Sequence, residues 1–308
     1  MLCTLRENYR LRSNSGAVSL EKMRAGGVLA QCFAIYIPTG SEALEEGLTL
    51  GPYEYYLEAL GVYRRELEEN AGLIRPALCA AHIAQNRSRG FMSSVLTVED
   101  AVLLEGDASR LERLYADGVR MMSLCWNYEN ELAFPNSRDE AIMSRGLKPF
   151  GFECVERMNA LGMAVDVSHL SAGGFRDVAQ HSKKPFAASH SCAAALCGHP
   201  RNLSDAQLRM LADRGGVVGV NFYPAFLSED EDGSVQHILR HMEHIYNTAG
   251  IDCLCIGSDF DGFGMECEID GCEKLPRLRR ELERLFSPSE LDKICSLNAL
   301  RFFADVIG

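Results

Sequence analysis

Ionisable side chains stand at the ends of four short apolar runs in this sequence. Glu99 closes SSVLTVE and His169 follows MAVDVS, whereas His190 follows KPFAAS and Asp259 follows CLCIGS. Zn²⁺ takes imidazole nitrogen and carboxylate oxygen as ligands in proteins. Singly, a histidine after such a run could bond a loop carbonyl, and Glu99 could be a helix N-terminal carboxylate. Together the four groups favour a metal site, because desolvated charges need partners.

Two further run ends carry polar and aromatic groups that could line a pocket. Trp126 and Asn127 follow RMMSLC, and Asn221 and Tyr223 close GVVGVNFYP. The indole N–H is only a donor, so Trp126 could bond a developing oxyanion. It could equally be a pocket wall, and the sequence leaves both interpretations open.

These runs have the length and composition of β-strands, and amphipathic stretches separate them. We expect strands at 28–37, 92–98, 120–125, 163–167, 185–188, 216–222 and 253–257. We expect helices at 52–70, 108–116, 150–161, 172–181, 204–214, 235–249, 275–285 and 288–303. Strands that alternate with helices indicate parallel βαβ units. The sequence therefore predicts an α/β fold, a (β/α)8 TIM-type barrel, whose catalytic groups gather at the carboxyl ends of the strands.

Seven strands are one fewer than a closed barrel of this kind needs. Before residue 28 the sequence offers at most residues 1–5 as the stub of a strand. We therefore expect a first strand that is truncated or absent, with a gap between the last strand and the strand at 28–37. Unpaired backbone groups at such a gap must be covered. Residues 1–27 are expected to be an irregular remnant of the first βα unit, within a single barrel domain spanning 1–308.

Composition excludes several classes of protein. The net charge of −12 excludes a nucleic-acid partner, since phosphate binding needs a basic surface. No apolar run is long enough to span a bilayer, and the first residues lack the apolar core of a secretory signal. The twelve cysteines lie mostly in apolar runs and are expected to be reduced, in a cytoplasmic protein. His237, His241 and His244 share one helix face, which we expect to be solvated.

Several blocks of the sequence resemble the membrane dipeptidase (renal dipeptidase) family of zinc peptidases and its bacterial cytosolic relatives. The matching text includes SLEKMRAGGVLAQCFAIYIP, VLTVE, LYADGVRMMSLCWNYEN and GFECVERMNALGMAVDVSHLS. It continues with ASHSCAAALCGHPRNLSD, GGVVGVNFYPAFL and IGSDFDG. The resemblance runs from about residue 18 to the C-terminus, and the SHS–HPRN and SDFDG blocks are specific to the family.

The resemblance implies that the predicted (β/α)8 barrel is of the metal-dependent hydrolase kind, and it implies roles for individual residues. Glu99 would bridge two zinc ions, and His169 and His190 would complete the ligands of one of them. Asp259 would take a proton from the attacking water and deliver it to the leaving nitrogen. Arg201, in HPRN, would hold the free carboxylate of a dipeptide, which suits a planar guanidinium.

Three more residues would border the substrate, namely Tyr223, Trp126 and Asn127. Trp126 stands where animal members of the family carry a histidine thought to stabilise the tetrahedral intermediate. The LCWNYEN form that surrounds it here is usual among the bacterial cytosolic relatives.

The N-terminus departs from the family pattern. The family begins with a strand ending in His-x-Asp, which supplies two ligands for the first zinc, whereas this chain places Met1 and Cys3 at those positions. We therefore expect one zinc ion, held by Glu99, His169 and His190.

The resemblance implies a zinc-dependent dipeptidase for small dipeptides, including those with a D-residue on the C-terminal side. We also expect a homodimer. The alternative is a weakened or inactive relative that binds one metal or none. A deaminase or phosphoesterase is disfavoured, because those enzymes usually open with a His-x-His strand.

Overall fold

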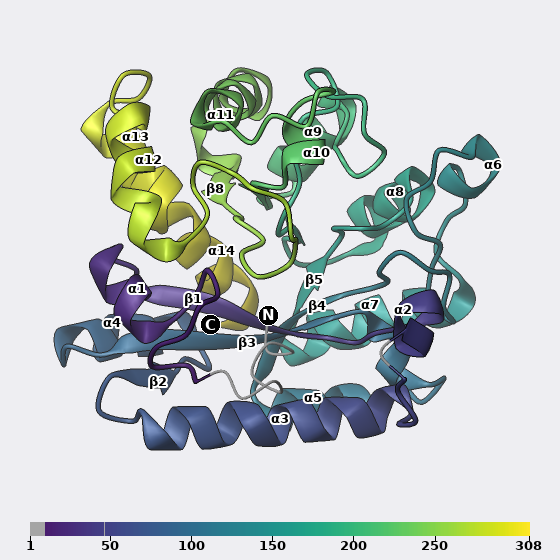
Figure 1. The fold of residues 1–308 in the computed structure, drawn as a ribbon. Coiled ribbons are helices and arrows are strands. Elements are labelled where there is room, and N and C mark those ends of the chain that lie inside the picture. The colour runs from purple at the N-terminus through teal and green to yellow at the C-terminus, as the bar shows by residue number, and fades with distance from the viewer. Residues whose placement is uncertain (1–9, 46) are drawn as a thin grey trace.

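The computed structural model describes residues 10–45 and 47–308 and shows a curled parallel sheet (Figure 1). Along the sheet the strand order is β1–β3–β4–β5–β6–β7–β8, and β2 pairs with β3 beside this path. All seven pairings are parallel. The strands are β1 Ala30–Tyr36, β2 Ile74–Pro76, β3 Met92–Glu99, β4 Val119–Ser123, β5 Ala164–Asp166, β6 Ala187–Ala188, β7 Val217–Val220 and β8 Leu254–Ile256. The α/β barrel architecture predicted from the sequence is confirmed.

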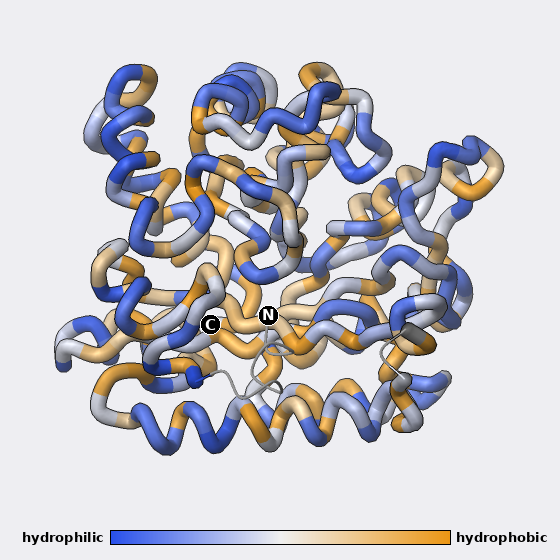
Figure 2. Tube along the Cα trace, in the orientation of Figure 1, coloured by the Kyte–Doolittle hydropathy of each residue, from blue (hydrophilic) through white to orange (hydrophobic). Residues whose placement is uncertain are grey.

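Each of the seven expected strands is present, and their burial explains why the sequence shows them clearly. Every residue of β3, β4 and β7 is buried, as expected for parallel strands covered by helices on the outside. Figure 2 shows the strand region as mostly apolar, whereas the outer helices alternate polar and apolar residues. The additional strand β2 was not predicted, because three residues that include a proline carry little strand signal.

Helices connect the strands and pack outside the sheet (Figure 1). The longer ones are α3 Pro52–Glu69, α4 Ala80–Ser88, α5 Arg110–Asp117, α7 Pro149–Leu161, α8 Ala172–His181, α9 Asp205–Asp213, α11 Val235–Ala249, α12 Leu275–Leu282 and α14 Asn298–Ile307. The shorter ones are α1 Leu20–Ala25, α2 Gly40–Glu45, α6 Glu140–Met143, α10 Pro224–Leu227 and α13 Pro288–Asp292. The predicted bounds are met at α8 and α11. Helix α1 lies inside the segment 1–27 that was expected to be irregular.

The C-terminal segment corrects one prediction. A single helix was expected at 288–303, but the chain forms α13, then a π-helical stretch at Lys293–Leu297, and then α14. The wider π turn shifts the side-chain register, and Leu297 projects into solvent. Periodicity alone could not show such an insertion.

Across residues 10–45 and 47–308, no strand joins the two ends of the curled sheet. Within the described residues β1 pairs with β3 only and β8 with β7 only, so the expected gap between these strands is present. A cavity of about 980 Å³ lies along this gap, and its walls include both strands, α4, α12 and the π-helical stretch. We call it the seam cavity. Residues 1–5, the expected strand stub, lie outside the described residues.

The histidines on α11 give a second correction. His241 is fully buried rather than solvated, and its ring accepts a bond from the Ala193 N–H and donates to the Leu227 carbonyl. This histidine therefore fastens α11 to two loops of the barrel.

Among the described residues no helix is long and apolar enough to cross a membrane.

Candidate metal centre

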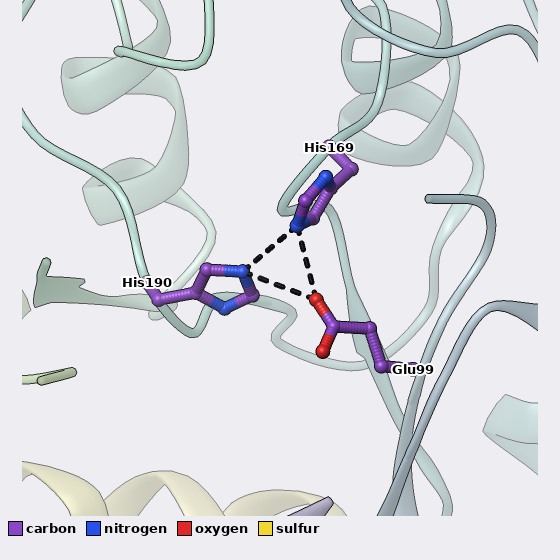
Figure 3. Close-up of side chains that lie close together, drawn as sticks. All are labelled: Glu99, His169 and His190. Carbon is purple, nitrogen blue, oxygen red and sulfur yellow. Dashed lines mark hydrogen bonds and ion pairs between the residues drawn. The ribbon is translucent and has the colours of Figure 1, made fainter. Parts of the chain in front are cut away.

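Three predicted ligands from the carboxyl ends of three strands of the sheet converge (Figure 3). Glu99 is the last residue of β3, His169 follows β5 and His190 follows β6. The Nε2 atom of His169 lies 3.0 Å from Oε1 of Glu99 and 3.0 Å from Nε2 of His190, which is itself 3.4 Å from Oε1 of Glu99. All three side chains are almost completely buried. Segments that lie far apart in the sequence thus bring one carboxylate and two imidazoles to a single point.

The other ring nitrogens show which atoms face that point. Nδ1 of His169 lies 2.9 Å from Oδ1 of Asn127, and Nδ1 of His190 lies 2.7 Å from Oγ of Ser189. Because an amide oxygen only accepts, the His169 proton sits on Nδ1 and its Nε2 carries a lone pair. Two imidazole lone pairs and a carboxylate at these separations repel one another unless a proton or a cation lies among them. The donor set fits a divalent transition metal such as Zn²⁺.

The electrostatics of the three ligands favour such an ion. Burial raises the pKa of Glu99, but the neighbouring imidazoles of His169 and His190 outweigh burial and hold that pKa well below the ordinary value. Burial and the Arg201 charge lower the pKa of His169 to about 3, which keeps the imidazole neutral. A neutral imidazole and an ionised carboxylate are the forms that bind metals.

Asp259 faces the same region from the end of β8. Asp259 accepts a 3.1 Å hydrogen bond from Nδ2 of the fully buried Asn221, and it lines the seam cavity together with Glu99 and His190. Burial and the neighbouring Glu99 charge raise its pKa. The backbone of Asp259 is left-handed, with φ 59°, and so is that of His169, with φ 72°. Such backbone conformations cost about 1–3 kcal/mol each and cluster at functional sites.

Arg201 is buried, not a solvated surface residue, with 5 % of its surface exposed. One guanidinium nitrogen donates 3.3 Å to the carbonyl of His190, and the group packs 5.3 Å from the Phe226 ring centre. Its Nε has no hydrogen-bond partner among the described residues. A buried guanidinium with an unused donor beside the ligand His190 can bind an anion.

The remaining predicted residues lie on two sides of the cluster. The Trp126 ring is 5.9 Å from that of His169 and 4.9 Å from that of Tyr36, so it borders the site. The amide oxygen of Asn127 accepts from Nδ1 of His169 and so orients this ring, and its contact with substrate stays a prediction. Tyr223 packs on Phe226, the ring beneath Arg201, with centres 4.8 Å apart.

The structure also shows residues that the sequence did not reveal. Asp166 ends β5 and accepts hydrogen bonds from Ser168 and Ser189, the residues that precede His169 and His190. A carboxylate inside the apolar run MAVDVS was the available signal. Asp261, at the second acidic position of SDFDG, accepts from the backbone of Ala17 and Val18 and so anchors the N-terminal segment. Met1 and Cys3 lie outside the described residues.

Comparison with known proteins gives consistent matches. The family model described as membrane dipeptidase (peptidase family M19) matches residues 1–307. A Klebsiella pneumoniae protein of the pqqA 5′ region is 36 % identical over 83 % of this chain and 97 % of its own length. Dipeptidase aclJ of Aspergillus oryzae is 31 % identical over 94 % of this chain and 70 % of its own length.

Two solved structures share the fold over nearly the whole chain. The M19 metallopeptidase dipeptidase AC has a TM-score of 0.88 at 27 % identity, covering 99 % of this chain and 94 % of its own. A metallopeptidase from Rhodobacter sphaeroides, bound to a phosphinate mimic of L-Ala-D-Ala, has a TM-score of 0.87 with the same identity and coverage. With the family model matched over residues 1–307, this chain belongs to the membrane dipeptidase family, peptidase family M19, whose members are metal-dependent hydrolases of peptide bonds.

Proposed function

We propose that this protein is a zinc-dependent dipeptidase whose single ion is held by Glu99, His169 and His190. The observation that carries the proposal is the convergence of these three ligand atoms within 4.8 Å of one another. When bound, the ion polarises the peptide carbonyl and lowers the pKa of a water molecule towards ~7. Three protein ligands leave a fourth position open, as catalytic zinc sites require.

The chain's own residues supply the remaining functions. Asp259, whose pKa is raised by burial, is suited to take a proton from the attacking water and return it to the leaving nitrogen. Arg201 holds the free C-terminal carboxylate of the dipeptide. Trp126 and Tyr223 border the substrate, the former beside His169 and the latter through Phe226.

Substrates with a C-terminal D-residue belong to this proposal. The Rhodobacter sphaeroides relative is bound to a mimic of L-Ala-D-Ala. We therefore include L,D-dipeptides such as L-Ala-D-Ala beside L,L-dipeptides as substrates of this protein.

A weakened dipeptidase is the second candidate. Among the described residues, only Glu99, His169 and His190 form a group that could hold a metal. With one ion in place of two, one of the two clamps on the reacting oxygens is lost, and activity should be well below that of a two-metal enzyme.

Zinc content and dipeptide turnover, measured together, test the proposal. The purified protein should hold one zinc per chain by elemental analysis and hydrolyse members of an L,L- and L,D-dipeptide panel. The variant Glu99→Gln should lose both zinc and activity. Glu156→Gln is the matched control, because Glu156 also bonds a histidine, His181, at 2.9 Å, but on the surface.

Each other outcome has a definite meaning. Two zinc ions per chain would refute the single-ion site. One zinc without turnover of any dipeptide would favour the inactive relative. Full zinc occupancy in Glu99→Gln would show that the Glu99 carboxylate is not a zinc ligand.

A further inference from the structure

A chain of hydrogen bonds runs behind His190, and its direction is set by a buried carboxylate. Ser189 lies between the Asp166 carboxylate and the Nδ1 atom of His190. We propose that Asp166, acting through the Ser189 hydroxyl, is the positioning residue that fixes the tautomer of His190 with Nε2 free to bind the ion. This inference rests on the proposed metal site and assigns residues that support it.

The donors and acceptors leave one arrangement. As a carboxylate, Asp166 only accepts: Oδ1 takes the Ser168 N–H at 2.9 Å and the Ser189 N–H at 3.0 Å, and Oδ2 takes the Ser189 hydroxyl. Ser189 has a single hydroxyl hydrogen, which is committed to Asp166. Its oxygen therefore accepts at 2.7 Å from Nδ1–H of His190. The lone pair of His190 is thus on Nε2, which faces Glu99 and His169.

The Ser168 hydroxyl is compatible with this arrangement. It accepts the His190 backbone N–H at 3.2 Å and lies 3.3 Å from the Ser189 oxygen. That oxygen has two lone pairs, so it can accept from Ser168 as well as from the imidazole. We call the hydrogen bonds from His190 through Ser189 to Asp166 the relay. Their direction is unchanged by Ser168.

The relay also joins the two loops that carry the histidines. Asp166 is the last residue of β5 and pairs with Ala187 of β6, so its carboxylate stands beside the start of both loops. It is 5 % exposed, and the three donors named above supply its hydrogen bonds. A carboxylate behind an imidazole ligand orients the ring and raises its basicity, and loss of such a partner typically lowers metal affinity 10- to 100-fold.

His169 provides an internal reference, because it is held differently. Its Nδ1 donates to the Asn127 amide oxygen and has no part in the Asp166–Ser189 relay. A change confined to the relay should therefore alter the tautomer of His190 and leave the tautomer of His169 unchanged.

The isosteric variant Asp166→Asn tests the direction of the relay. The amide oxygen can still accept the hydrogen bonds from the backbone N–H groups of Ser168 and Ser189, but the amide nitrogen then donates to the Ser189 hydroxyl oxygen. The freed hydroxyl hydrogen of Ser189 should then turn to Nδ1 of His190 at 2.7 Å, which is closer than the Ser168 oxygen at 3.3 Å, and the imidazole proton should move to Nε2. Histidine ¹⁵N spectra of the metal-free protein, recorded on the alkaline side of the imidazole titration, should show His190 changing tautomer and His169 unchanged.

Zinc affinity supplies the second readout. Competition with a chelator should show a roughly 10- to 100-fold weaker zinc complex for Asp166→Asn and for Ser189→Ala. Ser189→Thr keeps the hydroxyl and should keep most of the affinity. If Asp166→Asn does not fold, the two Ser189 variants carry the test by the same measurements.

The outcomes separate this inference from the proposed function. An unchanged His190 tautomer in Asp166→Asn would overturn the relay, as would equal changes at both histidines or equal zinc affinities for Ser189→Ala and Ser189→Thr. The tautomer is read without zinc or substrate. A tautomer switch in a protein that hydrolyses no dipeptide would therefore support the relay and refute the peptidase proposal.

Discussion

Arg201 is a charged side chain that folding removes from water and leaves with an unused donor. Among the described residues its guanidinium donates to the carbonyl oxygen of His190, and its Nε has no hydrogen-bond partner. Burial of an incompletely bonded charge is costly, so a ligand anion is its natural partner. We expect Arg201→Lys to raise KM for dipeptides with a free carboxylate.

The expected size of that effect follows from a charged hydrogen bond, about 1.5–3 kcal/mol, which corresponds to roughly 10- to 100-fold in kcat/KM. Dipeptide amides should be affected far less. Arg209→Lys, at an exposed ion pair with Asp205, is the control. Equal losses on free and amidated dipeptides would contradict a carboxylate-binding role.

The two ligand histidines should differ in the protons they release when zinc binds. Burial lowers the pKa of His190, but Asp259 and the bond to Glu99 outweigh burial and raise it above the ordinary 6.5. The pKa of His169 is about 3, so its imidazole is already neutral. At about pH 6.5 more than half of the His190 side chains are then protonated, so zinc should displace between half a proton and one proton from His190 and none from His169.

Calorimetry in buffers of different ionisation enthalpy measures this number. Because the raised pKa favours the protonated His190, zinc affinity should be full above that pKa. It should fall by about tenfold per pH unit as the pH drops below it. Release of clearly more than one proton near pH 6.5 would show that His169 is also protonated in the free protein.

At the scale of elements, two glycines let β7 and β8 approach the loop that carries His190. A Cβ on Gly219 would lie 2.2 Å from the Ser189 carbonyl oxygen, and one on Gly257 would lie 2.0 Å from the same atom. The Gly219 carbonyl in turn accepts from the Ser191 N–H at 2.8 Å. Backbone contact without side chains thus sets the position of the loop.

We expect Gly219→Ala to destabilise the fold by about 1–3 kcal/mol through overpacking and to weaken zinc binding by displacing Ser189 and His190. Denaturant unfolding and chelator competition measure the two effects. Gly61→Ala, in the middle of α3, would place its Cβ in ordinary contact with the Arg65 side chain at 3.7 Å, and should instead stabilise the protein by up to ~1 kcal/mol. Undiminished zinc affinity in Gly219→Ala would separate the glycine contact from the metal site.

At the scale of the whole molecule, the seam cavity borders a barrel strand, β1. Cys32, in the middle of β1, is exposed to the seam cavity, although protein atoms surround it. Burial and the Asp166 charge raise the pKa of this thiol to about 12. The thiolate is therefore scarce at neutral pH, but the sulfur can be reached by a small reagent.

We expect a small uncharged thiol reagent to label Cys32 in the folded protein, at a rate that rises about tenfold per pH unit between pH 8 and 10. Cys125, which is fully buried, should react only on unfolding. Peptide mapping after timed labelling gives both rates. Protection of Cys32 equal to that of Cys125 would mean that the seam is covered in solution.

Much of the site was predictable without coordinates. Parallel strands alternating with helices place the residue after each strand on one rim, so Glu99, His169, His190 and Asp259 could be selected from their positions alone. The gap between β1 and β8 in the described part of the chain could be predicted in the same way, because each buried strand has a distinct apolar run. The local periodicities of β-strands and helices carry this information.

Other features depend on contacts between residues distant in the chain, and these have no local signal. The burial of Arg201, the engagement of Asn127 by His169 and the relay from Asp166 to His190 arise where separate loops meet. The same holds for His241, whose helical spacing predicted a solvated face but whose ring bonds two loops of the barrel. Residue types and their order along the chain establish which donor groups reach the rim. The direction of each hydrogen bond, and hence the lone pairs left for a metal, follows from how the folded loops pack, because bonding geometry is set across strands rather than along them.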